Sequence, residues 1–267
     1  MSGNVTLLCC PTICLRVLRM NPAKSLPLPL LGNLKAFLTS ATGVLLTVAL
    51  LTLLCRIETT AVPWSPYFVI YGLLALLIPL WLGVAPIRPT RLAGKALWRL
   101  TAVVAVLAIS VDSGIFTISY DWLLGQLGLA QPFYSISGAT NLLIQTVSVR
   151  QHMSLLTATG IFGLFVLLWA PVAEELFYRG YVFGSLKQHL PLAAAWGISV
   201  AVFGLRHVIH FYYLWPNLSV AGVVWASSML IFGSLMTWLY ERSGGLGPSM
   251  LVHLLVNLAG LLAAPMP

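Results

Sequence analysis

Two adjacent glutamates in an apolar part of the chain are the residues best placed to do chemistry. Glu174 and Glu175 directly follow an apolar stretch, and Arg179 comes one helical turn after Glu175. Carboxylates at membrane depth are costly, so they usually pair or line a water-filled cavity, and they mark a functional site by default. On a helix, Arg179 can pair with Glu175, while Glu174 points about 100° away around the axis. The Glu175 carboxylate is then held by Arg179, and the Glu174 carboxylate is available for chemistry. A salt-bridge cluster without a catalytic role explains these three residues alone equally well.

A histidine in the next apolar stretch lies as far from the turn between the two stretches as Glu174 does. Leu190-Pro191 is typical of a tight turn between antiparallel helices, with Glu174 sixteen residues before residue 190 and His207 seventeen after it. A carboxylate beside an imidazole in a poorly solvated cavity can activate water as a general base, because each group changes the proton affinity of the other. We therefore expect Glu174 and His207 to face each other.

The last apolar stretch carries two further polar residues, His253 and Asn257, spaced to share one helix face. An imidazole and an amide both donate hydrogen bonds, which is what a tetrahedral oxyanion requires, although hydrogen bonding between membrane helices also explains the pair.

His207 and His253 lie at different distances along their helices from the turn that precedes each of them. His253 lies about 9 Å past Gly247, whereas His207 lies about 24 Å past Pro191, so they meet only if the turn near residue 190 projects from the membrane or the helices are tilted or broken.

Three motifs in order resemble those of a known family. Glu-Glu-x-x-x-Arg at 174–179, Phe203-x-x-x-His207 and His253-x-x-x-Asn257 look like the motif set of the CPBP intramembrane proteases, which include type II CAAX prenyl proteases and bacterial Abi or bacteriocin-immunity proteins. The resemblance covers about the last hundred residues. It implies that a water is activated by Glu174 and His207, that the oxyanion is stabilised by His253 and Asn257, and that the site is ordered by Glu175 and Arg179.

The resemblance implies a glutamate-type protease with no covalent acyl-enzyme and no required metal. Carboxylates and histidines are also zinc ligands, so a metalloprotease is the alternative. The zincin pattern His-Glu-x-x-His is absent from the sequence, and the four cysteines form no zinc-binding pattern. We therefore expect no metal and no cofactor, and we keep zinc as the less favoured alternative.

The composition requires a membrane around these residues. Of 267 residues, 59% are hydrophobic and 7% are charged, and mean hydropathy is +0.95, whereas a soluble domain carries about 25% charged residues. The apolar stretches are continuous rather than alternating, which favours helices over a barrel. The sequence predicts an all-α, polytopic transmembrane helical bundle of about seven to eight spans, with seven stretches that are long enough or nearly so: 36–56, 67–85, 98–120, 155–170, 192–211, 218–240 and 247–264.

The organisation of the chain follows from these stretches and the resemblance. We expect an N-terminal cytoplasmic or interfacial segment over residues 1–35, N-terminal transmembrane helices and a long connector over 36–153, and a catalytic CPBP-like core over 154–267.

The 14 basic residues are scattered singly between apolar stretches, which argues against nucleic-acid binding. They fall mostly in alternate connectors, and the positive-inside rule makes those connectors cytoplasmic. The N-terminus should thus be cytoplasmic in a plasma or inner membrane. Eleven basic residues, including Arg91, Lys187 and Arg242, fall on that side, against Arg56, Arg150 and Arg206 on the other.

The leading hypothesis is an intramembrane endopeptidase that cleaves a membrane-associated protein or peptide, by CAAX-type processing or a related reaction. One alternative is a proton-coupled transporter in which Glu174, Glu175 and His207 form a relay, but the first half of the chain contains no repeat of the Glu-Glu motif. The other is a non-catalytic scaffold or immunity protein with the family fold.

Overall fold

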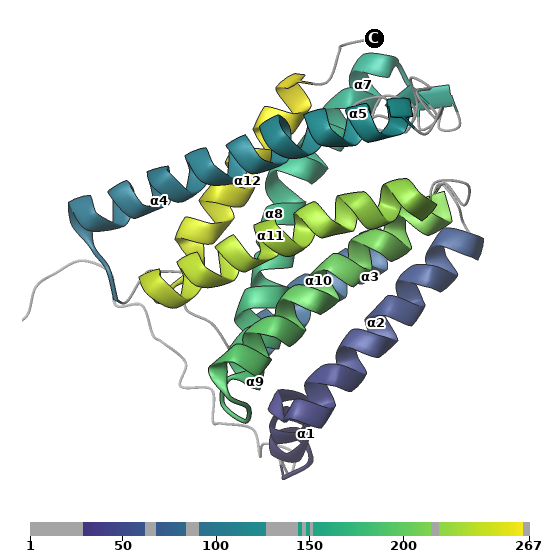
Figure 1. Cartoon of the computed structure of the whole chain (residues 1–267). Helices are drawn as coiled ribbons and strands as arrows, with labels where there is room; N and C mark the ends of the chain where they lie inside the picture. The colour runs from purple at the N-terminus through teal and green to yellow at the C-terminus, as the bar shows by residue number, and fades with distance from the viewer. Residues whose placement is uncertain are drawn as a thin grey trace, which may run out of the picture.

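The computed structural model is helical wherever it describes regular structure, as the sequence predicts (Figure 1). It describes residues 29–61, 68–83, 91–126, 144–145, 148–149, 152–214 and 219–263. The N-terminal half contributes α1 (Pro29–Thr39), α2 (Ala41–Ala61), α3 (Phe68–Leu82), α4 (Gly94–Ile109), the π-helical η1 (Ser110–Phe116) and α5 (Thr117–Gln126). The C-terminal half contributes α7 (Leu155–Leu164), η2 (Phe165–Trp169), α8 (Ala170–Glu174), η3 (Glu175–Phe183), α9 (Gly184–Leu186), α10 (Leu192–Leu214), α11 (Ser219–Ser243) and α12 (Leu246–Ala263).

The bundle exposes apolar side chains and buries charged ones, the reverse of a soluble protein. Leu50, Leu77, Leu156 and Leu262 are more than half exposed, whereas the charged and histidine side chains buried inside include Glu174, Glu175, Arg179, Arg206, His207 and His253. Such a surface is stable only against lipid, because water would have to solvate it at about 25 cal/mol per Å² of apolar area. The molecule is a helical integral membrane protein.

Fewer helices reach spanning length than the sequence predicts. Among the described residues, Gly94–Asp112 and Leu155–Leu186 are long and apolar enough to cross a membrane, and a third span results if the bent pair Leu31–Thr39 and Ala41–Leu54 counts as one. Three shorter apolar helices cover Gly72–Leu82, Leu192–His207 and Leu246–Leu262. The all-helical membrane fold is therefore confirmed, while the count of seven to eight spans stays a prediction.

The long helix Leu155–Leu186 changes its pitch before the two glutamates. Pro171 has no amide hydrogen, and its ring crowds the carbonyl of Leu167 one turn earlier. The wider π-helical turn η2 covers that carbonyl and relieves the crowding. The chain then returns to an α-helical turn up to Glu174 and widens again in η3, whose nine residues are all buried. Glu174 thus lies between the two π-helical stretches and Glu175 begins the second, and both are inside the bundle.

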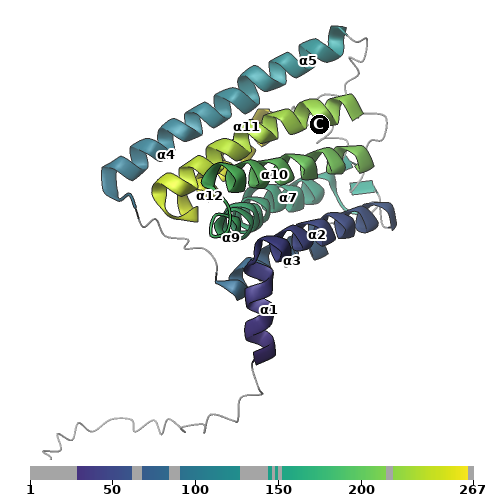
Figure 2. The same cartoon turned by 60° about the horizontal axis from the view of Figure 1, so that its bottom comes forward.

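A sharp elbow joins α1 to α2. The two helices meet at 84°, and Figure 2 shows α1 standing away from the remaining helices. Gly43 is required at the elbow, because a Cβ there would collide with the backbone of Phe37. The hydroxyl of Tyr181 donates to the carbonyl of Leu38 at 2.7 Å, which ties the elbow to η3 in the centre of the bundle.

Ion pairs connect three segments at one end of the bundle. Glu241, near the end of α11, accepts hydrogen bonds from Arg91 Nη1 at 2.6 Å and from Lys187 Nζ at 2.8 Å. The backbone amide of Arg91 also donates to the carbonyl of Ser243 at 2.9 Å. Three connectors far apart in the sequence therefore meet here, and two of their basic residues are ones that the charge pattern assigns to a single membrane face.

Candidate active site

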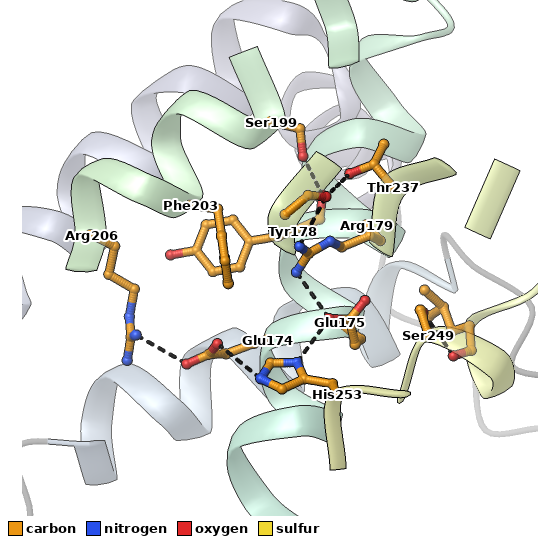
Figure 3. Close-up of polar contacts among 12 residues, drawn as sticks. Glu174, Glu175, Tyr178, Arg179, Ser199, Phe203, Arg206, Thr237, Ser249 and His253 are labelled. Atoms are coloured by element: carbon orange, nitrogen blue, oxygen red, sulfur yellow. Dashed lines mark hydrogen bonds and ion pairs between the residues drawn. The ribbon is translucent and has the colours of Figure 1, made fainter. Parts of the chain in front are cut away.

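Five side chains form a continuous polar chain across three helical segments (Figure 3). Arg206 Nη1 lies 3.0 Å from Glu174 Oε1, and the other oxygen, Glu174 Oε2, lies 3.9 Å from His253 Nε2. On its other side, His253 Nδ1 lies 2.9 Å from Glu175 Oε1, which also accepts from Arg179 Nη1 at 2.9 Å. The imidazole is thus placed between two carboxylates, each of which has its own guanidinium partner.

Glu175 and Arg179 form the most deeply buried part of this chain, with side chains 0% and 1% exposed. The guanidinium of Arg179 also donates to the carbonyl of Gly233 at 3.2 Å and lies 4.3 Å from the centre of the Phe203 ring. The predicted ion pair between Glu175 and Arg179 is present. Glu175 Oε2 is buried without a hydrogen-bond partner among the described residues.

The hydrogen bond to Glu175 fixes the orientation of His253. Because Glu175 Oε1 accepts from Arg179, it acts as an acceptor toward the ring as well, so Nδ1 of His253 carries a hydrogen. The second ring nitrogen, Nε2, then faces Glu174 across 3.9 Å. That separation is too long for a hydrogen bond and is the kind of gap that a single water bridges.

His207 approaches the same carboxylate from α10. It is 7% exposed, and its Nδ1 donates to the carbonyl of Phe203 at 2.8 Å. A carbonyl only accepts, so the neutral ring carries its hydrogen on Nδ1 and has Nε2 as the proton acceptor. Glu174 lies within electrostatic range of His207, as well as of Arg206 and His253. Glu174 and His207 are thus both buried inside the bundle and within electrostatic range of each other, while their facing each other stays a prediction.

Asn257 lies one turn further along α12 and contacts another part of the long helix. Its amide nitrogen donates to the carbonyl of Val166 at 2.8 Å. Val166 belongs to the π-helical η2, where the widened turn leaves carbonyl oxygens accessible to partners outside the helix. This bond anchors α12 to the glutamate-bearing helix, and no hydrogen bond between Asn257 and either glutamate is recorded among the described residues.

His207 and His253 both come within electrostatic range of Glu174, although they lie at different distances along their helices from the preceding turn. Lys187, just before the turn at residue 190, pairs with Glu241 near the end of α11, so the two turns lie at similar depth. The helix that carries the glutamates changes its pitch between them and Lys187, in the π-helical η3.

Arg206 is a site residue that the sequence analysis missed. Its charge was assigned to the non-cytoplasmic side, but its side chain is only 9% exposed and is paired with Glu174. The signal was present, because Arg206 lies in an apolar stretch three residues after Phe203 and next to His207, where an ionisable residue is a functional candidate by default. Asp112, in η1, was also missed; it is partly buried and within electrostatic range of His253.

The ligands and charges of the site are unfavourable for a metal ion. Among the described residues, no group of three or more His, Cys, Asp or Glu side chains is arranged to hold a metal ion. Glu174 Oε1 and Glu175 Oε1 are each within 3.0 Å of a guanidinium. Those fixed positive charges repel a further cation from the carboxylates that would have to bind it.

Comparison with known proteins finds similarity in the part of the chain that carries these residues. Residues 156–259 match the family model described as type II CAAX prenyl endopeptidase Rce1-like. The chain is also similar to the UPF0177 protein YxdF of Lactococcus lactis subsp. lactis (strain IL1403), with 29% identity over 146 residues, which is 54% of this chain and 70% of that protein. No solved structure matches the chain. All seven residues of the three motifs lie within the matched range.

Proposed function

From the match of residues 156–259 to the Rce1-like type II CAAX prenyl endopeptidase family model, we propose that the chain is a CPBP-type intramembrane protease and that it is a glutamate-type endopeptidase. Its substrate is a membrane-associated protein or peptide. The observation that carries the proposal is the convergence of Glu174, His207 and His253 on one buried position.

In the proposed mechanism, Glu174 and His207 activate a water molecule for attack on the peptide carbonyl. Glu174 takes up the proton, and His207 assists through Nε2, because its Nδ1 donates its hydrogen to the carbonyl of Phe203. His253 and Asn257 then stabilise the oxyanion, and Glu175 and Arg179 keep His253 in position. No covalent acyl-enzyme forms, since water itself is the nucleophile.

We also propose that the reaction needs no metal and no cofactor. The support is electrostatic, because Arg206 and Arg179 already neutralise the two carboxylates that zinc would need. A zinc-dependent reaction is the alternative, and chelation distinguishes the two.

The membrane topology belongs to the same proposal. We propose seven to eight spans, a cytoplasmic N-terminus and a site that opens toward the cytoplasm. The cluster of Arg91, Lys187 and Glu241 supports the orientation alone, because it gathers two basic residues that the charge pattern assigns to the cytoplasmic face. The proposed divisions 1–35, 36–153 and 154–267 place the motif residues in the last segment.

The test is cleavage of a membrane-protein peptide library by the purified full-length protein in detergent, read by mass spectrometry. We expect Glu174→Gln to abolish cleavage, because the amide cannot take up a proton, while thermal unfolding shows that the protein stays folded. Glu241→Gln is the matched control, since it removes a carboxylate outside the site and should leave cleavage intact.

Three outcomes would contradict parts of the proposal. Full activity of Glu174→Gln would exclude the carboxylate as a base. Loss of wild-type cleavage with a chelator would support the metalloprotease instead. Absence of any wild-type cleavage, together with phenotypic rescue by a Glu174/His207 double alanine variant, would favour the non-catalytic scaffold.

A further inference from the structure

Arg206 is a second buried cation in the site. Its Nη1 lies 3.0 Å from Glu174 Oε1, and both side chains are 9% exposed. Within the Phe203-x-x-x-His207 motif, Arg206 occupies one of the three unspecified positions, so the family resemblance gives it no role. The contact shows that Glu174, like Glu175, has an arginine of its own.

The strength of the ion pair between Arg206 and Glu174 depends on its burial. A carboxylate in an apolar bundle cannot be solvated by water, and its charged form is stable only with a partner that is equally buried. An exposed ion pair would contribute little, because water and salt screen it. Arg206 is thus in a position to keep Glu174 in the charged form that a general base requires.

The contact also selects one oxygen of the carboxylate. Arg206 engages Oε1, which fixes the rotation of the group and leaves Oε2 on the side of His253, 3.9 Å from Nε2. A water bound beside Oε2 would donate one hydrogen to it and keep its lone pairs for a substrate carbonyl. Without Arg206, the carboxylate is free to rotate away from the gap or toward another donor.

We propose that Arg206 is a positioning residue, which holds the Glu174 carboxylate by Oε1 so that Oε2 faces the reacting water. This inference rests on the proposed peptidase function. Arg206 acts on the substrate only through Glu174, so its loss should lower kcat and leave KM nearly unchanged.

The experiment measures steady-state kinetics on the best-cleaved peptide from the library, with wild-type, Arg206→Lys and Arg206→Ala proteins. We expect kcat of Arg206→Ala to fall about 10- to 100-fold, the loss seen when a group that orients a metal ligand is removed, with KM within about twofold. Arg206→Lys keeps the charge and should retain more activity than Arg206→Ala. Arg91→Ala is the control for loss of an arginine from an ion pair, because Arg91 pairs with Glu241 far from the site.

Chemical rescue separates positioning from a merely structural role. Guanidinium ions at millimolar concentration should restore part of the kcat of Arg206→Ala, whereas urea, which has a similar shape but no charge, should not. A general loss of fold would respond to neither reagent. Because Arg206→Ala leaves a buried carboxylate without its partner, the double variant Glu174→Gln/Arg206→Gln serves as a folding control. Unfolding of the wild type, Glu174→Gln, Arg206→Gln and this double variant forms a double-mutant cycle, which should show coupling between the two residues.

Two kinetic results would overturn the inference about Arg206. A rise in KM at constant kcat would mean that Arg206 binds substrate, and unchanged kinetics with no coupling in unfolding would mean that the contact has no role; either result overturns the inference while the proposed function stands. A wild-type protein that cleaves no peptide overturns the proposed function itself, and with it the reaction that Arg206 is inferred to serve.

Discussion

Glu175 and Arg179 show how a charged pair is kept inside an apolar bundle at the residue scale. Their spacing along the helix made the pair predictable, but their complete burial was not, because burial depends on α10, α11 and α12 closing around them. Arg179 reaches Gly233 of α11 and the Phe203 ring of α10, and Glu175 reaches His253 of α12. Each contact replaces a hydrogen bond that water would otherwise supply.

Removal of the arginine from this pair should be costly. We expect Arg179→Met to destabilise the protein by about 3–5 kcal/mol, because it leaves Glu175 charged and buried without a cation. Thermal unfolding in detergent, followed by circular dichroism, measures the change. Arg91→Met is the control, since that side chain is 57% exposed and the loss of an exposed pair costs about 0–1 kcal/mol. Equal effects of the two substitutions would contradict the role given to burial.

At the scale of helices, the site depends on how closely α10 approaches α11. The two helices pack side by side (Figure 1), and glycines on both make the approach close. A Cβ on Gly204 of α10 would lie 2.5 Å from the side chain of Leu230, and a Cβ on Gly233 of α11 would lie 3.0 Å from the Phe203 ring. Small residues at such contacts are the usual way in which membrane helices pack, because lipid gives them no hydrophobic drive to associate.

A larger residue at Gly204 should force the two helices apart. We expect Gly204→Leu to destabilise the protein by about 1–3 kcal/mol, the usual cost of overpacking, and to reduce cleavage by moving Arg206 and His207 away from Glu174. Gly197→Leu on the same helix is the matched control, because a Cβ there meets nothing within 4 Å. That substitution should be neutral or slightly stabilising, since leucine favours a helix over glycine by close to 1 kcal/mol. The measurement is the unfolding temperature and the cleavage activity of both variants. If Gly204→Leu changed neither, the close approach of α10 and α11 at Gly204 would be contradicted.

At the scale of the whole molecule, Glu241 joins the segment before α4, the turn after α9 and the end of α11. Burial alone would raise the pKa of the Glu241 carboxyl, but hydrogen bonds from Lys187 and Arg91 outweigh it and hold this pKa below its ordinary value of 4.5. A carboxyl whose pKa is lower in the folded state contributes stability above its unfolded pKa. That contribution disappears as the pH falls through the folded value.

The linkage gives a pH-dependent prediction for Glu241→Gln. We expect the variant to be less stable than the wild type at pH 7, because the amide has no charge for Lys187 and Arg91 to pair with. The difference should stay constant down to pH 4.5 and shrink below it, as the wild-type carboxyl takes up a proton. Unfolding temperatures of both proteins across this range measure the effect, and a difference that does not change with pH would show that the ion pairs do not stabilise the fold.

The sequence by itself determined the membrane environment, the helical class and a short list of reactive residues. The low content of charged residues indicates a membrane around the protein. The spacing of four residues on a helix predicts the ion pair between Glu175 and Arg179. The positions of Glu174 and His207 on either side of one turn put them at the same height. These features are local or depend on counting along one hairpin, so no knowledge of distant contacts is needed.

Only the tertiary structure decided which partners these residues have. His253 lies between the two glutamates because α12 packs against the long helix that carries them. Arg206 changed from a marker of membrane sidedness to the partner of Glu174 for the same reason. Contacts between helices depend on crossing, depth and local pitch, which the apolar pattern of one helix does not record. The physical cause is burial itself, since a charge kept from water must find a partner on whichever helix the fold brings beside it.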